Sequence, residues 1–226
     1  MSLIVTAFVP SCIVMGGDSR LTLKYPDPFT GNFISQIAND TTQKVFNIQN
    51  KFGLSTHGAA SINGIQLPFH IYQFVTQNIN NATEIEDLPE LLLRHFSDNL
   101  GRPNTFFHLA GYKLINETPT QYVYRLDINN RLAIRLNLAN DANAIYNAEC
   151  GGEIEVLITL RELNPVNFNV SNQQQAVGFI DWVINTASTR LNANGYSSVG
   201  GPTDILMISP NGSQWLRRKP LNINVL

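Results

Sequence analysis

The fold is decided by the stretch Cys12-Ile13-Val14-Met15-Gly16-Gly17-Asp18-Ser19-Arg20. Its apolar half predicts a buried strand, and the glycine pair predicts that the strand ends sharply at a group of polar residues. A second apolar run covers residues 3–9, and Pro10-Ser11 between the two runs predicts a short turn. We therefore expect an antiparallel hairpin that brings Asp18 back toward Ser2.

Length and composition limit the class of protein. The chain has 226 residues, which suits a single domain over residues 1–226. Its net charge of −2 gives no reason to expect nucleic acid or an anionic membrane as a partner. No apolar run approaches the roughly 18 residues of a membrane span, and no secretory signal is recognisable, so we expect a cytoplasmic protein. Cys12 and Cys150 are expected as buried free thiols.

The remaining pattern alternates between blocks of strands and pairs of helices. Residues 25–35, which include two prolines and a glycine, are interpreted as a loop. Apolar spacing predicts helices over 61–79, from Asp87 to Gly101, over 153–162 and from Ser171. Further strands are expected at 44–48, 52–56, 105–113, 121–127, 131–137, 204–209 and 214–216. Because an apolar sheet face must be buried, this order predicts an α+β fold, a four-layer αββα sandwich of two antiparallel sheets flanked by helices.

Four motifs occur in a fixed order: Gly16 to Arg20, Lys44-Val45-Phe46-x-Ile48, Thr56-His57-Gly58-Ala59-Ala60, and Gly200-Gly201-Pro202-Thr203-Asp204. Together they resemble the N-terminal-nucleophile (Ntn) hydrolases, and within that class the proteasome β-subunit and its bacterial relatives. The resemblance covers nearly the whole chain. It implies a hydrolase, a protease that begins with a Ser or Thr nucleophile and assembles into homo-oligomeric rings. It implies no cofactor and no metal.

The resemblance also implies roles for individual residues. Ser2, once Met1 is removed, would be the nucleophile, and its free α-amine would be the general base, since such an amine has an ordinary pKa of about 7.7–8.0. Asp18 would hold a charged Lys44 beside it, and the Gly58 N–H would face the oxyanion. The residues implied to border the substrate are Thr22, Thr56 and Ala60.

The sequence departs from the family pattern at two supporting positions. The segment Glu149 to Gly152 lacks the serine that assists the N-terminal amine in the family. The segment Tyr196 to Val199 lacks a carboxylate, although Ser197 or Ser198 could replace the second family serine.

Simpler interpretations compete at each position. Ser2 could be an ordinary strand start or an expression remnant, residues 18–20 could close a turn with an ion pair, and Lys44 could be an exposed strand lysine. His57 is expected to point away from Thr56, and His108 to lie in the core.

The remaining features indicate no second chemistry: no histidine pair has metal-ligand spacing, the glycine pairs form no phosphate loop, and residues 217–219 suggest a solvated basic tail.

Three functions remain open. The first is a proteasome-like peptidase that cleaves peptide or protein substrates with Ser2. The second is a catalytically inactive structural or assembly subunit, suggested by the missing serine and carboxylate. The third is a small-molecule amidase on the same fold, which would process short substrates and need no chamber. The sequence does not identify an ATP-dependent unfoldase partner.

Overall fold

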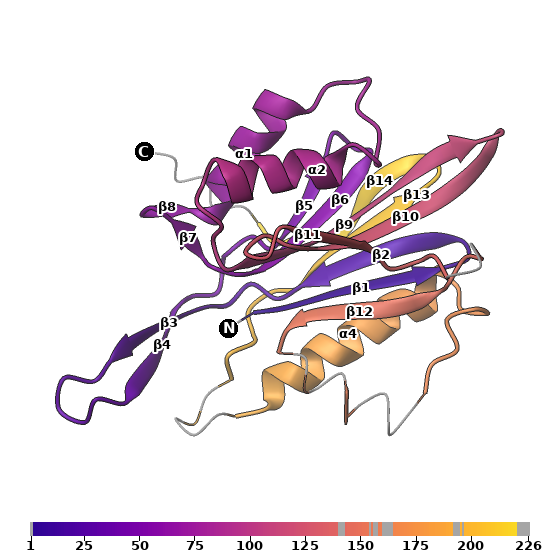
Figure 1. The fold of residues 1–226 in the computed structure, drawn as a ribbon. Helices are drawn as coiled ribbons and strands as arrows, with labels where there is room; N and C mark the ends of the chain where they lie inside the picture. Colours follow the sequence, from indigo (N-terminus) through magenta and orange to yellow (C-terminus); the bar gives the residue numbers. More distant parts are fainter. Residues whose placement is uncertain are drawn as a thin grey trace.

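The computed structural model describes residues 2–220, except 140–142, 154, 156–157, 160–164, 192–194 and 196. Within these residues lie two five-stranded antiparallel sheets and two smaller two-stranded sheets (Figure 1). The strand order is β12-β1-β2-β13-β14 in the first large sheet and β11-β10-β9-β6-β5 in the second.

The predicted N-terminal hairpin is confirmed at the centre of the first sheet. This sheet consists of β1 (Leu3–Val9), β2 (Cys12–Gly17), β12 (Asn147–Gly152), β13 (Asp204–Ser209) and β14 (Gly212–Arg217). Every residue of β1 and β2 is buried, which explains why their apolar runs are continuous instead of alternating. In the register of this hairpin, Ile4 lies opposite Gly17, so Ser2 and Asp18 come to the same end of the sheet.

The second large sheet packs against the first. It consists of β5 (Val45–Ile48), β6 (Phe52–Gly58), β9 (Thr105–Ile115), β10 (Thr118–Asp127) and β11 (Leu132–Arg135). Phe8 and Met15 from the first sheet and Val45 and Val123 from the second belong to one buried apolar cluster between them. Helix α4 (Gln173–Thr189) packs on the first sheet, while α1 (Leu67–Asn78), α2 (Leu88–Leu93) and the π-helical segment η1 (Arg94–Asp98) pack on the second (Figure 1).

The predicted four-layer αββα sandwich of two sheets is wrong. The structure is mostly β, with 42% strand against 21% helix, and its described residues form four separate antiparallel sheets. The two unpredicted sheets are the ribbon of β3 (Leu21–Pro26) and β4 (Phe33–Asn39) and the hairpin of β7 (Ser61–Ile62) and β8 (Ile65–Gln66). The ribbon was missed because its prolines and glycine suggest a loop, whereas they lie only at the end where the ribbon reverses.

The predicted helix over 61–79 also begins later than expected. Asn63 and Gly64 both have positive φ angles, of 51° and 79°, which is the backbone of a two-residue hairpin turn between β7 and β8. The helix starts only at Leu67, with Pro68 in its first turn, where a proline costs no hydrogen bond.

The other helix predictions have mixed outcomes. Asp87 precedes α2, but its carboxylate accepts the N–H of Glu84 and does not cap the helix. Helix α4 begins at Gln173, two residues later than predicted, after a capping box formed by Asn172 and Gln175. The predicted helix over 153–162 falls largely outside the described residues. No helix in the described part of the chain is long and apolar enough to cross a membrane.

Candidate active site

One small pocket of about 50 Å³ brings together residues from several segments of the chain. Six of the seven predicted site residues line it: Ser2, Thr22, Lys44, Thr56, Gly58 and Ala60. The seventh, Asp18, contacts Lys44 and has no exposed surface. Ser2 lies just before β1, Lys44 just before β5, and Gly58 ends β6, so the pocket forms where these strands end.

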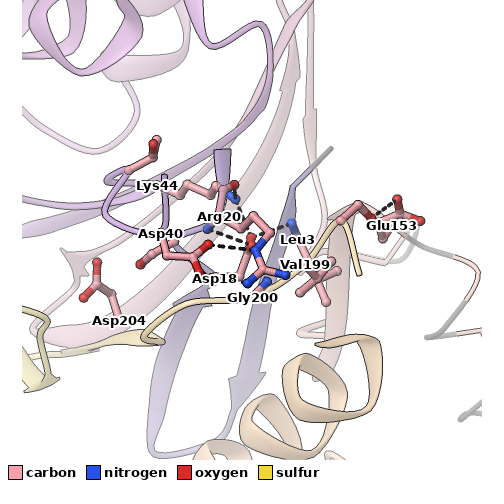
Figure 2. Close-up of polar contacts among 12 residues, drawn as sticks. Leu3, Asp18, Arg20, Asp40, Lys44, Glu153, Val199, Gly200 and Asp204 are labelled. Carbon is pink, nitrogen blue, oxygen red and sulfur yellow. Dashed lines mark hydrogen bonds and ion pairs between the residues drawn. The ribbon is translucent and has the colours of Figure 1, made fainter. Parts of the chain in front are cut away.

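Lys44 is a buried member of an ion pair. Its Nζ lies 2.5 Å from Oδ1 of Asp18 and 2.7 Å from the carbonyl oxygen of Arg20 (Figure 2). Only 3% of Lys44 is exposed, which rules out the interpretation as an exposed strand lysine. Asp18 pairs with Lys44, whereas the Arg20 guanidinium pairs with Asp40. The alternative that an ion pair between Asp18 and Arg20 closes a turn is therefore also wrong.

Asp18 is held rigidly by main-chain donors. Its carboxylate accepts hydrogen bonds from the backbone N–H groups of Leu3, Arg20 and Gly200, at 2.9, 3.1 and 3.1 Å (Figure 2). These donors come from the start of β1, from the motif itself and from the late glycine pair. Asp18 belongs to the first of the four motifs and contacts Lys44 of the second and Gly200 of the fourth. Three of the four motifs therefore meet at this carboxylate.

Burial changes the acidity of Lys44. Removal from water lowers the pKa of its ammonium group, and the negative charge of Asp18 partly opposes this effect. The ion pair therefore places a buried charge at the wall of the pocket.

Gly58 has a conformation that other residues rarely adopt. Its φ angle is +102°, and a Cβ at this position would lie 2.4 Å from the carbonyl oxygen of Asn104. The glycine therefore permits the close approach of β6 to residue 104 at the wall of the pocket.

The two threonines of the pocket differ in how their hydroxyl groups are used. Thr56 donates to the carbonyl oxygen of Phe106 at 3.1 Å. The Thr22 hydroxyl is buried and has no hydrogen-bond partner among the described residues. Because a buried hydroxyl without a partner costs free energy, Thr22 is the threonine suited to bind a substrate.

His57 lies on the wall of the same pocket as Thr56. Its ring stacks on Phe106, with centroids 4.8 Å apart and planes 6° apart, and lies against Gly151. Burial lowers the pKa of His57 to about 4, so the ring is neutral at pH 7.

Glu153 is a residue near Ser2 that the sequence did not indicate. Its backbone N–H donates to the carbonyl oxygen of Ser2 at 3.0 Å, and its carboxylate accepts the Ser198 hydroxyl at 2.7 Å (Figure 2). A carboxylate and a serine therefore lie beside the first strand, although residues 196–199 contain no acid. Ser197, the alternative serine, donates instead to the carbonyl oxygen of Ala187.

A second buried ion pair lies at the start of β13. Lys219 is 6% exposed and pairs with Asp204, which also accepts the Lys219 N–H. The prediction of a solvated tail is therefore wrong for Lys219. Asp204 lies opposite Gly17 in the sheet, so this second ion pair is close to the Asp18 motif. The positive charge of Lys219 further lowers the pKa of Lys44.

Arg20 links two other segments of the chain near the site. Its guanidinium pairs with both carboxylate oxygens of Asp40, at 2.7 and 2.8 Å, and donates to the carbonyl oxygen of Ser197. It packs so closely on Gly200 that a Cβ there would lie 2.5 Å from the Arg20 Cζ atom. The predicted removal of Met1 concerns a residue outside the described part of the chain.

No cluster of three or more His, Cys, Asp or Glu residues that could hold a metal ion occurs among the described residues. Comparison with known proteins gives no family for this chain, because no family model matches it. No curated protein matches it either.

Proposed function

We propose that this chain hydrolyses peptide bonds with Ser2 as an N-terminal nucleophile, in the manner of the proteasome-like enzymes that its motifs resemble. The observation that supports the proposal most is the buried Lys44–Asp18 pair at a pocket that also contains Ser2 and Gly58. Burying an ion pair costs free energy, so a pair kept beneath a pocket favours a chemical role.

The proposed reaction begins with attack of the Ser2 Oγ on the substrate carbonyl carbon. The hydroxyl proton passes to the α-amine of Ser2, which is free once Met1 is removed. The C–N bond then breaks, the leaving amine takes that proton, and an ester to Ser2 remains. Water attacks the ester, gives a proton back to the Ser2 oxygen and releases a carboxylic acid.

The neighbouring groups stabilise the charges that appear in these steps. The Lys44 ammonium, positioned by Asp18, favours the developing negative charge at the Ser2 oxygen. The Gly58 N–H would donate to the oxyanion, a contribution of about 2.7–4 kcal/mol for one such donor in other hydrolases. The free hydroxyl of Thr22 would bind the substrate main chain or side chain.

Two features support the rest of the proposal. The β3–β4 ribbon exposes large apolar side chains, among them Leu23 at 50%, Phe29 at 95% and Phe33 at 71%, which suits contact with further copies in a homo-oligomeric ring. Cys12 and Cys150 are both buried thiols, which suits a reducing compartment such as the cytoplasm.

A small-molecule amidase is the second candidate. The pocket beside Ser2 holds only about 50 Å³, which favours a short substrate or a small side chain. Sedimentation separates the two candidates, since a stable monomer or dimer that hydrolyses short amides contradicts the ring-forming peptidase.

The test begins with the mass of the intact protein, which should lack Met1. Ser2→Ala should abolish peptide cleavage and labelling by an electrophilic inhibitor, whereas Ser2→Thr keeps a hydroxyl and should retain activity. Ser11→Ala, at an exposed turn, is the matched control. Unchanged cleavage by Ser2→Ala, or activity with Met1 still attached, contradicts the mechanism. A folded protein that forms no adduct at Ser2 supports the inactive subunit instead.

A further inference from the structure

A second cavity opens beside the candidate active site, in a cleft between the two large sheets. It has a volume of about 290 Å³. Its walls come from the second sheet through His57, Arg125 and Asp127, and from the first sheet through residues 149–152. His57 lines both this cleft and the pocket that contains Ser2, so the two cavities are neighbours.

Gly152, which lines the cleft, lies against the main chain of Ser2. Gly152 lies opposite Leu3 in the sheet, and a Cβ on Gly152 would lie 1.7 Å from the carbonyl oxygen of Ser2. Ser2 therefore lines the pocket of Thr56 and Ala60 and also contacts a wall residue of the cleft. A substrate attacked at Ser2 has two halves, and only one of them can occupy the pocket.

Two glycines and one ring give the cleft its shape. A Cβ on Gly151 would lie 2.3 Å from Cδ2 of His57, so only glycine lets the ring lie against this strand. The stacking of His57 on Phe106 fixes the ring from the second sheet. The wall between the two cavities is therefore preformed, as small-molecule sites usually are.

The charges in the cleft are unequal. Arg125 donates to Oε1 of Glu149 at 2.8 Å, and these two charges cancel. Asp127 remains, with its carboxylate bound only by the backbone and side-chain N–H groups of Asn130 among the described contacts. Since His57 is neutral at pH 7, the lining carries two carboxylates against one cation.

We propose that this cleft binds the leaving-group half of the substrate and prefers a positively charged group, an amine or a guanidinium. The assignment to the leaving group rests on the proposed function, because it requires attack at Ser2. The preference for a cation rests on the lining alone. A guanidinium would pair with Asp127 and with the Glu149 oxygen that Arg125 leaves unused.

The first experiment measures binding without catalysis. Argininamide and norleucinamide, both acetylated at the α-nitrogen so that only the arginine side chain carries a charge, are titrated into the full-length Ser2→Ala protein, and the signals of the His57 ring are followed by NMR. Argininamide should bind at least 5-fold more tightly, and Glu149→Gln or Asp127→Asn should reduce that ratio about 3- to 10-fold. Glu90→Gln, at an exposed position on α2, should leave it unchanged. Equal binding of the two amides, or a ratio unaffected by both cleft variants, overturns the preference.

The second experiment measures cleavage. Two peptides differ only after the scissile bond, with arginine in one and norleucine in the other. The ratio of their kcat/KM values should exceed 5 in the wild type and fall toward 1 in Glu149→Gln. Cleavage of both peptides at equal rates overturns this inference and leaves the proposed function standing. If neither peptide is cleaved while argininamide still binds in the cleft, the proposed function fails and the cation site stands.

Discussion

The Nζ of Lys44 lies 2.5 Å from Oδ1 of Asp18, and neither side chain is more than 4% exposed. In water such a pair would contribute little, but here each partner has given up its hydration. Three backbone N–H groups from distant parts of the chain also converge on the same carboxylate. The pair therefore both organises the site and supplies its charge.

Lys44→Met should remove activity and stability together. Peptide cleavage should fall at least 100-fold, because the pocket that Ser2 lines loses the positive charge of Lys44. The free energy of unfolding should fall by about 3–5 kcal/mol, because Asp18 is left buried without its cation. Urea unfolding and cleavage are measured under conditions where circular dichroism shows folded protein. Lys51→Met, which breaks the half-exposed pair with Glu84, is the control and should leave cleavage unchanged. Full activity in Lys44→Met contradicts the assigned role.

Glu153→Gln tests whether the Glu153 carboxylate affects the proposed base, since the backbone N–H of the same residue binds the Ser2 carbonyl oxygen. A nearby negative charge favours the protonated amine, so its removal should move the acidic limb of the cleavage–pH profile to lower pH, by up to about 1 unit. The glutamine side chain keeps an oxygen for the Ser198 hydroxyl, and the backbone bond to Ser2 is unaffected. Ser198→Ala keeps the charge, so it should change the rate without moving the limb. An unmoved limb in Glu153→Gln shows that the carboxylate does not face the amine.

Gly58→Ala should destabilise the protein, whereas Gly178→Ala should stabilise it. At residue 58 the φ angle of +102° and the approach to the Asn104 oxygen make any side chain costly, by about 1–3 kcal/mol. Gly178 lies inside α4, and a Cβ there would meet no atom within 4 Å, so alanine gains about 0.8–1 kcal/mol of helix propensity. Urea unfolding measures both changes. A neutral Gly58→Ala contradicts the assigned conformation.

Local sequence predicts the members of this site better than the sheets that hold them. Asp18, Lys44 and Gly58 each belong to a short motif at a strand end, and Ser2 directly precedes the first strand. The strand ends of one hairpin must come together. The β3–β4 ribbon was missed for a physical reason: proline and glycine at its tip have the same composition as a loop. Nothing within residues 21–39 tells whether the flanking residues pair.

Glu153 and Lys219 were missed because their roles depend on distant partners. Glu153 meets Ser198 across 45 residues, and Lys219 meets Asp204 only because β14 returns along β13. A basic run such as residues 217–219 is usually solvated, and only the neighbouring acid in space changes that. The useful sequence signal was the lone Asp204 at the start of an otherwise apolar strand, since a buried acid requires a cation.

Acid should destabilise the protein through its buried histidines. His108 is fully buried, with Nδ1 3.0 Å from the Thr6 hydroxyl, and burial lowers its pKa from 6.5 to about 3. Between these two values the unfolded chain binds a proton that the folded chain does not. The histidine's contribution to stability is therefore complete above pH 6.5 and is lost as the pH falls toward 3. The greatest slope from one such group is about 1.4 kcal/mol per pH unit.

His108→Gln should remove that part of the slope, while the slope from His57, whose pKa is about 4, remains. The free energy of unfolding is measured by urea at about pH 7, 6, 5 and 4, a range that spans the titration of the unfolded histidine. Thr6→Val removes the hydrogen bond but keeps the histidine, so it should lower stability at every pH and leave the slope as in the wild type. If His108→Gln keeps the full wild-type slope, the acid sensitivity comes from other groups and the folded chain must protonate His108 as easily as the unfolded one.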